Sequence, residues 1–302
     1  MRRALKLCLA GGVCWLALLF SVQAWADVVW VALSSKEPVY QETANAIRAA
    51  LPNDEVRVGE WDEFNFKTSP PQILVTVGGE ALRQLHRSVD KTRIIALLVP
   101  RSTLDELSDA SAPGRITGVY YEQPFSRQVS LLRTAFPERL RVGVVLGPAT
   151  VRYRNQLASS FSRAGMQGVF EVIQDKAELA DAVQSVLANS DVFLALPDAE
   201  AINNQTVKFI LLASYRRGVP VVGYSASFVK AGAAFAMVSS PAQIGKEAAQ
   251  MVHESLPGRK LPAPRAPDDF DLLVNTNVLR SLHLSLDVDR LEKRVRSEGG
   301  IR

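Results

Sequence analysis

The stretch Val28-Val-Trp-Val-Ala-Leu33 is an unbroken apolar run, and the residues that follow it change period. A short run rich in β-branched residues is typical of a strand buried on both faces of a parallel sheet. Tyr40, Ala44 and Ile47 then recur at the spacing of one helix face, and Leu51 extends the stripe. A buried strand followed by an amphipathic helix is the unit of α/β proteins, so this stretch predicts that class.

The same pair of patterns recurs along the rest of the chain. Further strands are predicted at Ile73–Val77, Ile94–Val99, Ile116–Tyr120, Val142–Leu146, Val169–Ile173, Val192–Leu196, Val219–Tyr224 and Phe235–Val238. Apolar stripes predict helices within 125–136, 157–164, 179–186 and 244–252. Ser240 followed by Gln243 matches a capping box, and Pro241 suits a first helical position. Repeated β-α-β units predict parallel sheets covered by helices on both faces.

Two loop-like stretches interrupt this alternation. Ser, Asp, Ala, Pro and Gly cluster at Ser108–Gly114, and several prolines fall within Leu256–Pro267. A chain of 302 residues is long enough for about two domains. We therefore expect two α/β lobes, with the chain passing between them near these stretches.

Residues 1–26 have the pattern of a secretory signal peptide. Basic residues at positions 2, 3 and 6 precede an apolar run from Leu7 to Phe20, and Ala24-Trp-Ala26 matches a cleavage site. The run is too short for a membrane span, which needs about 20 residues. Cys14 lies inside it without the small-residue box of a lipoprotein. We expect cleavage after Ala26 and a periplasmic protein.

Removal of this leader changes the cysteine and charge inventories. Cys8 and Cys14 both leave with it, so the mature chain has no cysteine and depends on its core for stability. It keeps 32 basic and 31 acidic residues, a balance that does not favour nucleic acid as a partner. Residual basicity lies in residues 291–302, a basic tail, and we interpret the stretch Arg290–Arg296 as a solvated helix end.

Catalytic and metal-binding motifs are absent from the sequence. Neither a P-loop nor G-x-G-x-x-G follows the first strand. Gly223-Tyr-Ser-Ala-Ser227 resembles a nucleophile elbow but has serine in place of its second glycine. His86, His253 and His283 are not paired at metal-ligand spacing. We predict no cofactor, no metal and no enzymatic activity. A histidine or lysine beside Ser225 in the folded protein would favour the alternative that the protein is an enzyme.

The polar turns that follow the strands are the remaining candidates for a site. Ligands of open α/β sheets bind at the carboxyl ends of strands, where helix starts also favour anions. The candidate turns are Ser34–Glu37, Gly78–Glu80, Pro100–Ser102, Gly147–Thr150, Pro197–Glu200 and Tyr224–Ser227. Tyr121, Tyr153 and Tyr224 could add stacking faces. Any α/β protein has such turns, so the alternative for each is capping or chain reversal.

Several segments, taken in order along the chain, resemble one family. They are Arg115–Val119, Gln128–Phe136, Arg141–Leu146, Asp191–Asp198, Arg217–Gly223, Ser227–Ala233 and Phe270–Asn275. The set is similar to periplasmic solute-binding proteins of ABC transporters, in the uncharacterised ABC substrate-binding group whose better-known members look like binders of tryptophan or other aromatic amino acids. The resemblance covers about Arg115 to Leu284 and is weaker over Asp27–Ser108.

The resemblance implies a type I periplasmic binding fold, an α/β Venus-flytrap architecture of two Rossmann-like lobes with parallel sheets. The N-terminal lobe would comprise residues 27–119 and 231–256. The C-terminal lobe would comprise residues 120–230 and 257–290, ahead of the tail. Three chain crossings would join the lobes, and the ligand would lie between them.

Ligand contacts are expected at the strand-end turns, with one aromatic wall residue added. The expected ligand-binding residues are Ser35, Gly78, Gly79, Gly147, Tyr153, Pro197, Asp198, Tyr224 and Ser225. Many relatives carry acidic residues where Tyr224 and Ser225 stand here. Asp198 could hold a ligand ammonium group and the amides of Gly78 and Gly79 a carboxylate, while an uncharged or aromatic solute is equally open.

The implied function is capture of a small solute by hinge closure and its delivery, by a monomer, to an inner-membrane ABC permease. The same cleft would equally serve a module that signals to a sensor kinase or another envelope partner. Both alternatives need the same site, so the sequence leaves them open.

Overall fold

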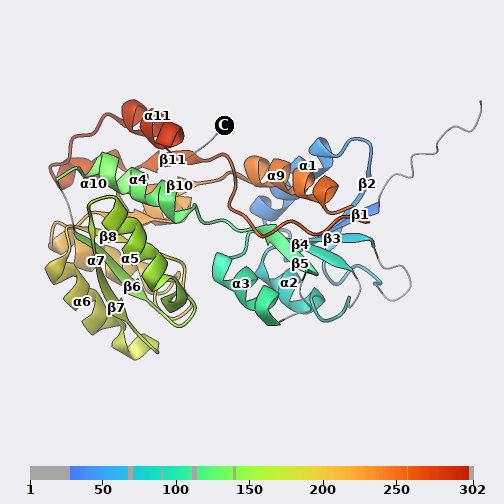
Figure 1. Cartoon of the computed structure of the whole chain (residues 1–302), viewed down its shortest axis with the longest axis horizontal. Coiled ribbons are helices and arrows are strands. Elements are labelled where there is room, and N and C mark those ends of the chain that lie inside the picture. Colours follow the sequence, from blue (N-terminus) through green and yellow to red (C-terminus); the bar gives the residue numbers. More distant parts are fainter. Residues whose placement is uncertain are drawn as a thin grey trace, which may run out of the picture.

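The structure is a computed structural model that describes residues 28–66, 71–89, 92–110, 114–138, 141–256 and 258–298. The predicted signal peptide, residues 1–26, lies outside the described residues, as do residues 299–302. Figure 1 shows two bodies, each built around its own sheet and joined by extended segments.

The first lobe is built on a five-stranded, wholly parallel sheet. Its strands lie in the order β2 (Glu55–Glu60), β1 (Val28–Leu33), β3 (Ile73–Val77), β4 (Arg93–Leu97) and β5 (Ile116–Val119). Its helices are α1 (Pro38–Ala50), α2 (Gly79–Leu85), α3 (Arg101–Ala110) and α9 (Pro241–Glu254). α1 and α9 pack on one face of the sheet, and α2 and α3 on the other. The opening apolar run is thus a central strand, buried from Val29 to Leu33.

The second lobe is built on a six-stranded mixed sheet. Its strands lie in the order β11 (Asp271–Val274), β10 (Phe235–Val238), β9 (Val221–Gly223), β8 (Val192–Leu194), β6 (Arg141–Leu146) and β7 (Gln167–Val172), and only β11 is antiparallel. Its helices are α4 (Phe125–Ala135), α5 (Arg154–Arg163), α6 (Leu179–Asn189), α7 (Val207–Arg216), α8 (Ala226–Ala231), α10 (Thr276–Ser281) and α11 (Val288–Glu298), with short turns η1 (Val151–Tyr153) and η2 (Lys176–Glu178). α4, α5, α10 and α11 cover one face; α6, α7 and α8 cover the opposite face.

Helix α9 belongs to the first lobe because it packs closely on α1. Gly245 makes this approach possible, since a Cβ there would lie 2.5 Å from the Ala46 Cβ and 2.9 Å from the Thr43 carbonyl oxygen. The predicted capping box starts this helix: the Ser240 hydroxyl accepts from Gln243 N, and Gln243 Oε1 accepts from Ser240 N.

The lobe boundaries differ from those expected at two places. The first crossing is not one of them: β5 pairs with β4 up to Val119, so the chain leaves the first lobe at 120–124, after the expected residues 27–119, although the loop-like stretch Ser108–Gly114 is not the crossing itself. β10 pairs with β9 through Phe235 and Val222, so residues 231–238 lie in the second lobe and the return crossing is at 239–240. Residues 258–265 stay with the first lobe, because Arg265 N donates to the Gly118 carbonyl at 3.0 Å.

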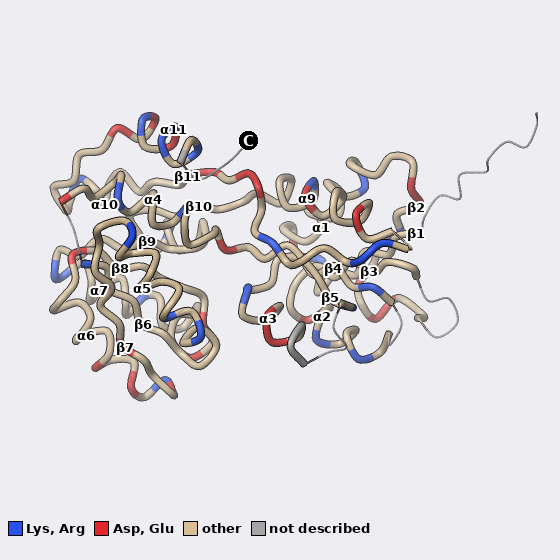
Figure 2. The backbone as a smooth tube through the Cα atoms, viewed as in Figure 1, with Lys and Arg blue, Asp and Glu red and all other residues tan. Residues whose placement is uncertain are grey.

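The basic stretch is a helix end, as expected, but within the described residues it is not a solvated tail. Residues 291–298 belong to α11, and Leu291 and Val295 are 3% and 1% exposed in the core of the second lobe. The basic residues lie on the outer side of this stripe, as in any amphipathic helix. The charges are interspersed over both lobes, in line with the near balance of 35 basic and 31 acidic residues in the sequence (Figure 2). Within the described ranges no helix is long and apolar enough to cross a membrane.

Candidate ligand-binding cleft

A cleft of about 880 Å³ lies between the two lobes. This volume is within the range of about 300–1,000 Å³ that small-molecule sites occupy. The first lobe lines it with the starts of α1, α3 and α9, and the second lobe with the turn after β8 and the start of α8. The residues after β4, β8 and β9 all reach it, as expected for a site at the carboxyl ends of strands.

Four of the nine predicted ligand contacts line this cleft. They are Pro197, Asp198, Tyr224 and Ser225. The residues found around the cleft do not include Ser35, Gly78, Gly79, Gly147 or Tyr153. These five residues have local roles elsewhere in the structure.

Gly78 and Gly79 serve the start of α2. Gly78 has a φ of +94°, a conformation that favours glycine, and a Cβ there would lie 2.4 Å from the Ser34 hydroxyl. That hydroxyl accepts a hydrogen bond from Ala81 N at 2.9 Å, so Ser34 already satisfies this helix start. Ser35 accepts from Glu37 N at 3.4 Å, just before α1. The Gly78 turn thus belongs to a helix start, and the Ser35 contact is a local turn before α1, so both fit the alternative of capping or chain reversal that the sequence left open.

Asp198 lies on the cleft wall, but its carboxylate is engaged within the second lobe. Oδ2 accepts from the amide of Thr150 at 3.1 Å and from its hydroxyl at 2.9 Å. Oδ1 accepts from Glu200 N at 3.0 Å and Ala201 N at 3.2 Å. Gly147 makes room for this carboxylate, because a Cβ there would lie 2.1 Å from Oδ1. Asp198 therefore joins two turns of the wall, and its four donors leave little of it for an ammonium group.

Aromatic rings form part of the cleft wall. Tyr121 and Tyr224 have ring centroids 6.2 Å apart, and Tyr224 lies 5.1 Å from the buried Phe228. The Tyr224 hydroxyl donates to the Ile202 carbonyl at 3.1 Å. Burial, followed by the nearby charge of Glu122, raises the pKa of Tyr224 to about 12, so the phenol stays neutral. Tyr40 brings a third ring from the first lobe.

The polar part of the wall is largely uncharged and slightly acidic. Sequence reasoning singled out the turn at Pro100–Ser102 but missed Glu106, Asn203 and Asn204, because they lie one turn beyond the strand-end residues. Glu106 and Asp198 are the charged side chains among the described residues that line the cleft. A ligand with net negative charge therefore meets no cationic side chain there.

Tyr153 lies in a contact between the lobes. Its hydroxyl donates to Asp105 Oδ2 of α3 at 2.6 Å, and the Arg101 guanidinium stacks 4.8 Å from its ring. Burial and the Asp105 carboxylate raise the pKa of Tyr153, so it acts as a donor. Glu122, on the first crossing, accepts from Arg101 N with both oxygens, at 3.0 and 2.9 Å. This cluster joins α3 to the second lobe beside the cleft.

Glu122 is expected to make stability depend on pH. Burial is the main cause that raises the pKa of Glu122 from 4.5 to about 7. The titratable groups around its carboxyl are Arg101, Asp105, Tyr121, Tyr153 and Tyr224. Because the folded protein binds this proton more tightly than the unfolded chain, stability is highest below pH 4.5 for this group and falls as pH rises to about 7. The slope is at most about 1.4 kcal/mol per pH unit.

Glu122→Gln should flatten this dependence, because the amide oxygen still accepts from Arg101 N without titrating. Urea unfolding at pH 5, 6, 7 and 8 measures it, with the exposed Glu138→Gln as a control that keeps the wild-type profile. Identical pH profiles for wild type and Glu122→Gln would remove Glu122 as the cause.

No group of three or more potential metal ligands occurs in the ranges that the structure describes. The arrangement suits non-covalent binding: aromatic faces, hydroxyls, amides and helix starts converge on one cleft from two bodies.

Comparison with known proteins places this chain in a family. The sequence pattern of the family described as ABC transporter substrate binding protein matches residues 63–295, and the chain belongs to that family. The match begins upstream of the region in which the sequence resemblance was strongest. The two-lobed architecture is the type I periplasmic binding fold. The family binds solutes for transport across a membrane, which implies a small-molecule ligand and a membrane permease.

Solved structures share the fold at low sequence identity. A conserved domain protein from Vibrio cholerae is 21% identical with a TM-score of 0.61, over 89% of this chain and 98% of that one. An ABC domain in complex with L-Trp from Streptococcus pneumoniae is 15% identical with a TM-score of 0.61, over 88% and 98%. A ligand-free, open substrate-binding protein from Clostridium difficile is 14% identical with a TM-score of 0.65, over 87% and 96%. No curated protein matches the chain in sequence.

Proposed function

We propose that this protein, after export and removal of residues 1–26, captures a small neutral or zwitterionic solute in the interlobe cleft and presents it as a monomer to an inner-membrane ABC permease. One observation carries this proposal: a cleft of ligand size is walled by both lobes at the carboxyl ends of their strands. A solute that contacts both walls favours the closed arrangement of the lobes over the open one.

The charges and rings of the wall support an aromatic zwitterion as the solute class. Tyr121 and Tyr224 offer ring faces to an aromatic or apolar portion. Ser102 and Thr103, in the first turn of α3, line the cleft and bring hydroxyl groups that can donate to a carboxylate. Glu106, one turn later, is an exposed carboxylate that suits an ammonium group. The L-Trp in the pneumococcal structure is a ligand of this class.

A panel of probes separates these contributions. The panel contains the twenty L-amino acids, tryptamine, which lacks the carboxylate, and indole-3-acetate, which lacks the ammonium group. Thermal unfolding is followed against probe concentration, because a ligand of the folded state raises the midpoint by mass action. Aromatic L-amino acids are expected to stabilise the protein most, and both analogues less. A midpoint that no member of the panel raises would contradict the proposed solute class.

Ala199→Trp is expected to abolish binding. Ala199 lines the cleft and is exposed in the turn that follows Asp198, so an indole there fills ligand space without disturbing the core. Calorimetric titration with the best probe should show at least a 100-fold loss of affinity, about 2.7 kcal/mol. Ala177→Trp, on an exposed turn of the same lobe, is the matched control and should bind like wild type. Equal affinity in both variants would place the ligand outside this cleft.

A further inference from the structure

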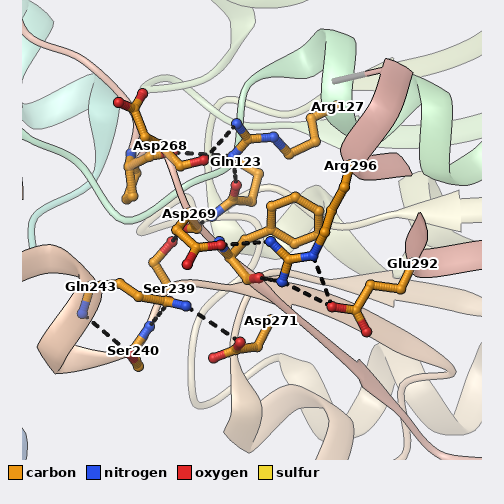
Figure 3. Close-up of polar contacts among 12 residues, drawn as sticks. Gln123, Arg127, Ser239, Ser240, Gln243, Asp268, Asp269, Asp271, Glu292 and Arg296 are labelled. Carbon is orange, nitrogen blue, oxygen red and sulfur yellow. Dashed lines mark hydrogen bonds and ion pairs between the residues drawn. The ribbon is translucent and has the colours of Figure 1, made fainter. Parts of the chain in front are cut away.

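The three segments that cross between the lobes are joined to one another by a chain of side-chain hydrogen bonds. Gln123, on the first crossing, donates through Nε2 to the Ser239 hydroxyl at 3.0 Å. Ser239, on the second crossing, donates to the Asp269 carbonyl of the third at 2.6 Å. One residue from each crossing thus takes part, and the Ser239 hydroxyl both accepts one hydrogen bond and donates another (Figure 3).

Two arginines hold the far end of the third crossing on the second lobe. Arg127 of α4 donates to the carbonyls of Pro267 and Asp268 at 3.1 and 3.2 Å, and also to Gln123 Oε1. Arg296 of α11 donates to Asp269 Oδ1 at 2.6 Å and to the Phe270 carbonyl. Figure 3 shows both guanidinium groups converging on this segment from different helices.

The Phe270 ring fixes the same end of the crossing in the core. It is 0% exposed, and the guanidinium carbons of Arg127 and Arg296 lie 4.9 and 4.6 Å from its centroid. Arg296 is itself held by Glu292, one turn earlier on α11, at 2.9 Å. Arg296 therefore couples the C-terminal helix to the crossing through several partners.

The near end of the third crossing is held on the first lobe. Arg265 pairs with Glu247 and Glu254 of α9, at 2.5 and 2.7 Å. Its backbone N–H donates to the Gly118 carbonyl of β5, and its carbonyl accepts from Tyr120 N, the residue that follows β5. Only Ala266 lies between Arg265, fixed to one lobe, and Pro267, fixed to the other.

We propose that α11 is a hinge-control element: Arg296, together with Arg127, confines the bend of the third crossing to Ala266 and so sets how far the lobes open. Releasing Arg296 removes its bonds to Asp269 and to the Phe270 carbonyl, so that only Arg127 and the buried Phe270 ring still hold residues 267–270 on the second lobe. The segment is then held less firmly, which widens the range of interlobe distances. The inference rests on the proposed function in one respect: the motion that this hinge would permit is closure of the lobes over a solute. It is tested without any ligand, so failure to find a solute leaves the result unaffected.

The test is a distance measurement between spin labels, one on each lobe. The mature chain has no cysteine, so Ala49→Cys on α1 and Ser159→Cys on α5, both exposed, give a unique interlobe pair. Ser159→Cys with Ala188→Cys on α6 gives a pair within the second lobe. Pulsed electron resonance on the ligand-free mature protein should show that Arg296→Ala widens the interlobe distribution about twofold and leaves the intralobe distribution unchanged.

Lys293→Ala is the matched control, because it removes a positive charge from an exposed position of the same helix and should change neither distribution. An interlobe distribution in Arg296→Ala equal to that of wild type overturns the proposal. If Arg296→Ala also disturbs the intralobe pair, Asp269→Asn decides, since it removes the ion pair at 2.6 Å without shortening any side chain. Widening in Asp269→Asn supports the proposal, and an unchanged interlobe distribution overturns it.

Discussion

Replacing Asp198 with alanine is expected to lower the free energy of unfolding of the second lobe by about 3–5 kcal/mol. The side chain is 6% exposed and its two oxygens accept four hydrogen bonds, at 2.9 to 3.2 Å. Alanine leaves the buried amides of Thr150 and Ala201, and the partly buried amide of Glu200, without this acceptor. Each unsatisfied buried donor costs about 1–3 kcal/mol, and relaxation of the turns recovers part of the total.

Urea unfolding followed by far-ultraviolet circular dichroism measures this loss. Asp198→Asn is the control, because it keeps one acceptor oxygen and should cost about half as much. Gly147→Ala should also destabilise the protein, since its methyl group collides with the same carboxylate. If Asp198→Ala remained within about 0.5 kcal/mol of wild type, the range of ordinary surface substitutions, the carboxylate would not hold this turn. It would then be free for a ligand ammonium group.

Arg265→Ala is expected to cost the first lobe about 3–5 kcal/mol, because it leaves a buried carboxylate without its partner. The side chain of Glu247 is 7% exposed and lies 2.5 Å from the Arg265 guanidinium. The pair with Glu254 adds less, since that side chain is 33% exposed and solvent screens it. The loss should therefore come mainly from Glu247.

Tryptophan fluorescence isolates this effect. A protein that begins at residue 27 has two tryptophans, Trp30 and Trp61, both in the first lobe, so their signal reports that lobe. Arg265→Met combined with Glu247→Leu should recover most of the stability, because it replaces an ion pair by apolar groups of similar size. A double variant as unstable as Arg265→Ala alone would show that the unpaired carboxylate is not the cause.

The periodicity of the chain predicted the fold well where strands are fully buried. The run at Val28–Leu33 is the centre of its sheet, and the stripe beginning at Tyr40 is α1. The edge strand β2 was missed because Glu55-Val-Arg-Val-Gly-Glu60 is half exposed and carries no apolar run. The assignment of β10 to the wrong lobe has a different reason. The apolar pattern of a strand predicts that the strand is buried, but it does not predict which neighbouring strand it pairs with.

The rule that ligands bind at strand ends predicted where the cleft lies. It did not predict which strand-end side chains face the cleft and which have other partners. Pro197 and Tyr224 reach the cleft because they follow β8 and β9. Gly78 follows β3 in the same way, yet Ser34 occupies the space beside it. Spacing along the chain does not reveal such partners, since Ser34 and Ala81 are 47 residues apart. The role of Tyr153 was hidden for the same reason, because Asp105 belongs to the opposite lobe.

The central claim is that the two lobes close over a solute held between them. The interlobe label pair at positions 49 and 159 measures this directly when the probe that most raises the unfolding midpoint is added to the mature protein. We predict that saturating probe shortens and narrows the interlobe distance distribution in wild type and leaves it unchanged in Ala199→Trp. A probe that binds wild type while the interlobe distribution stays as it was would contradict the account.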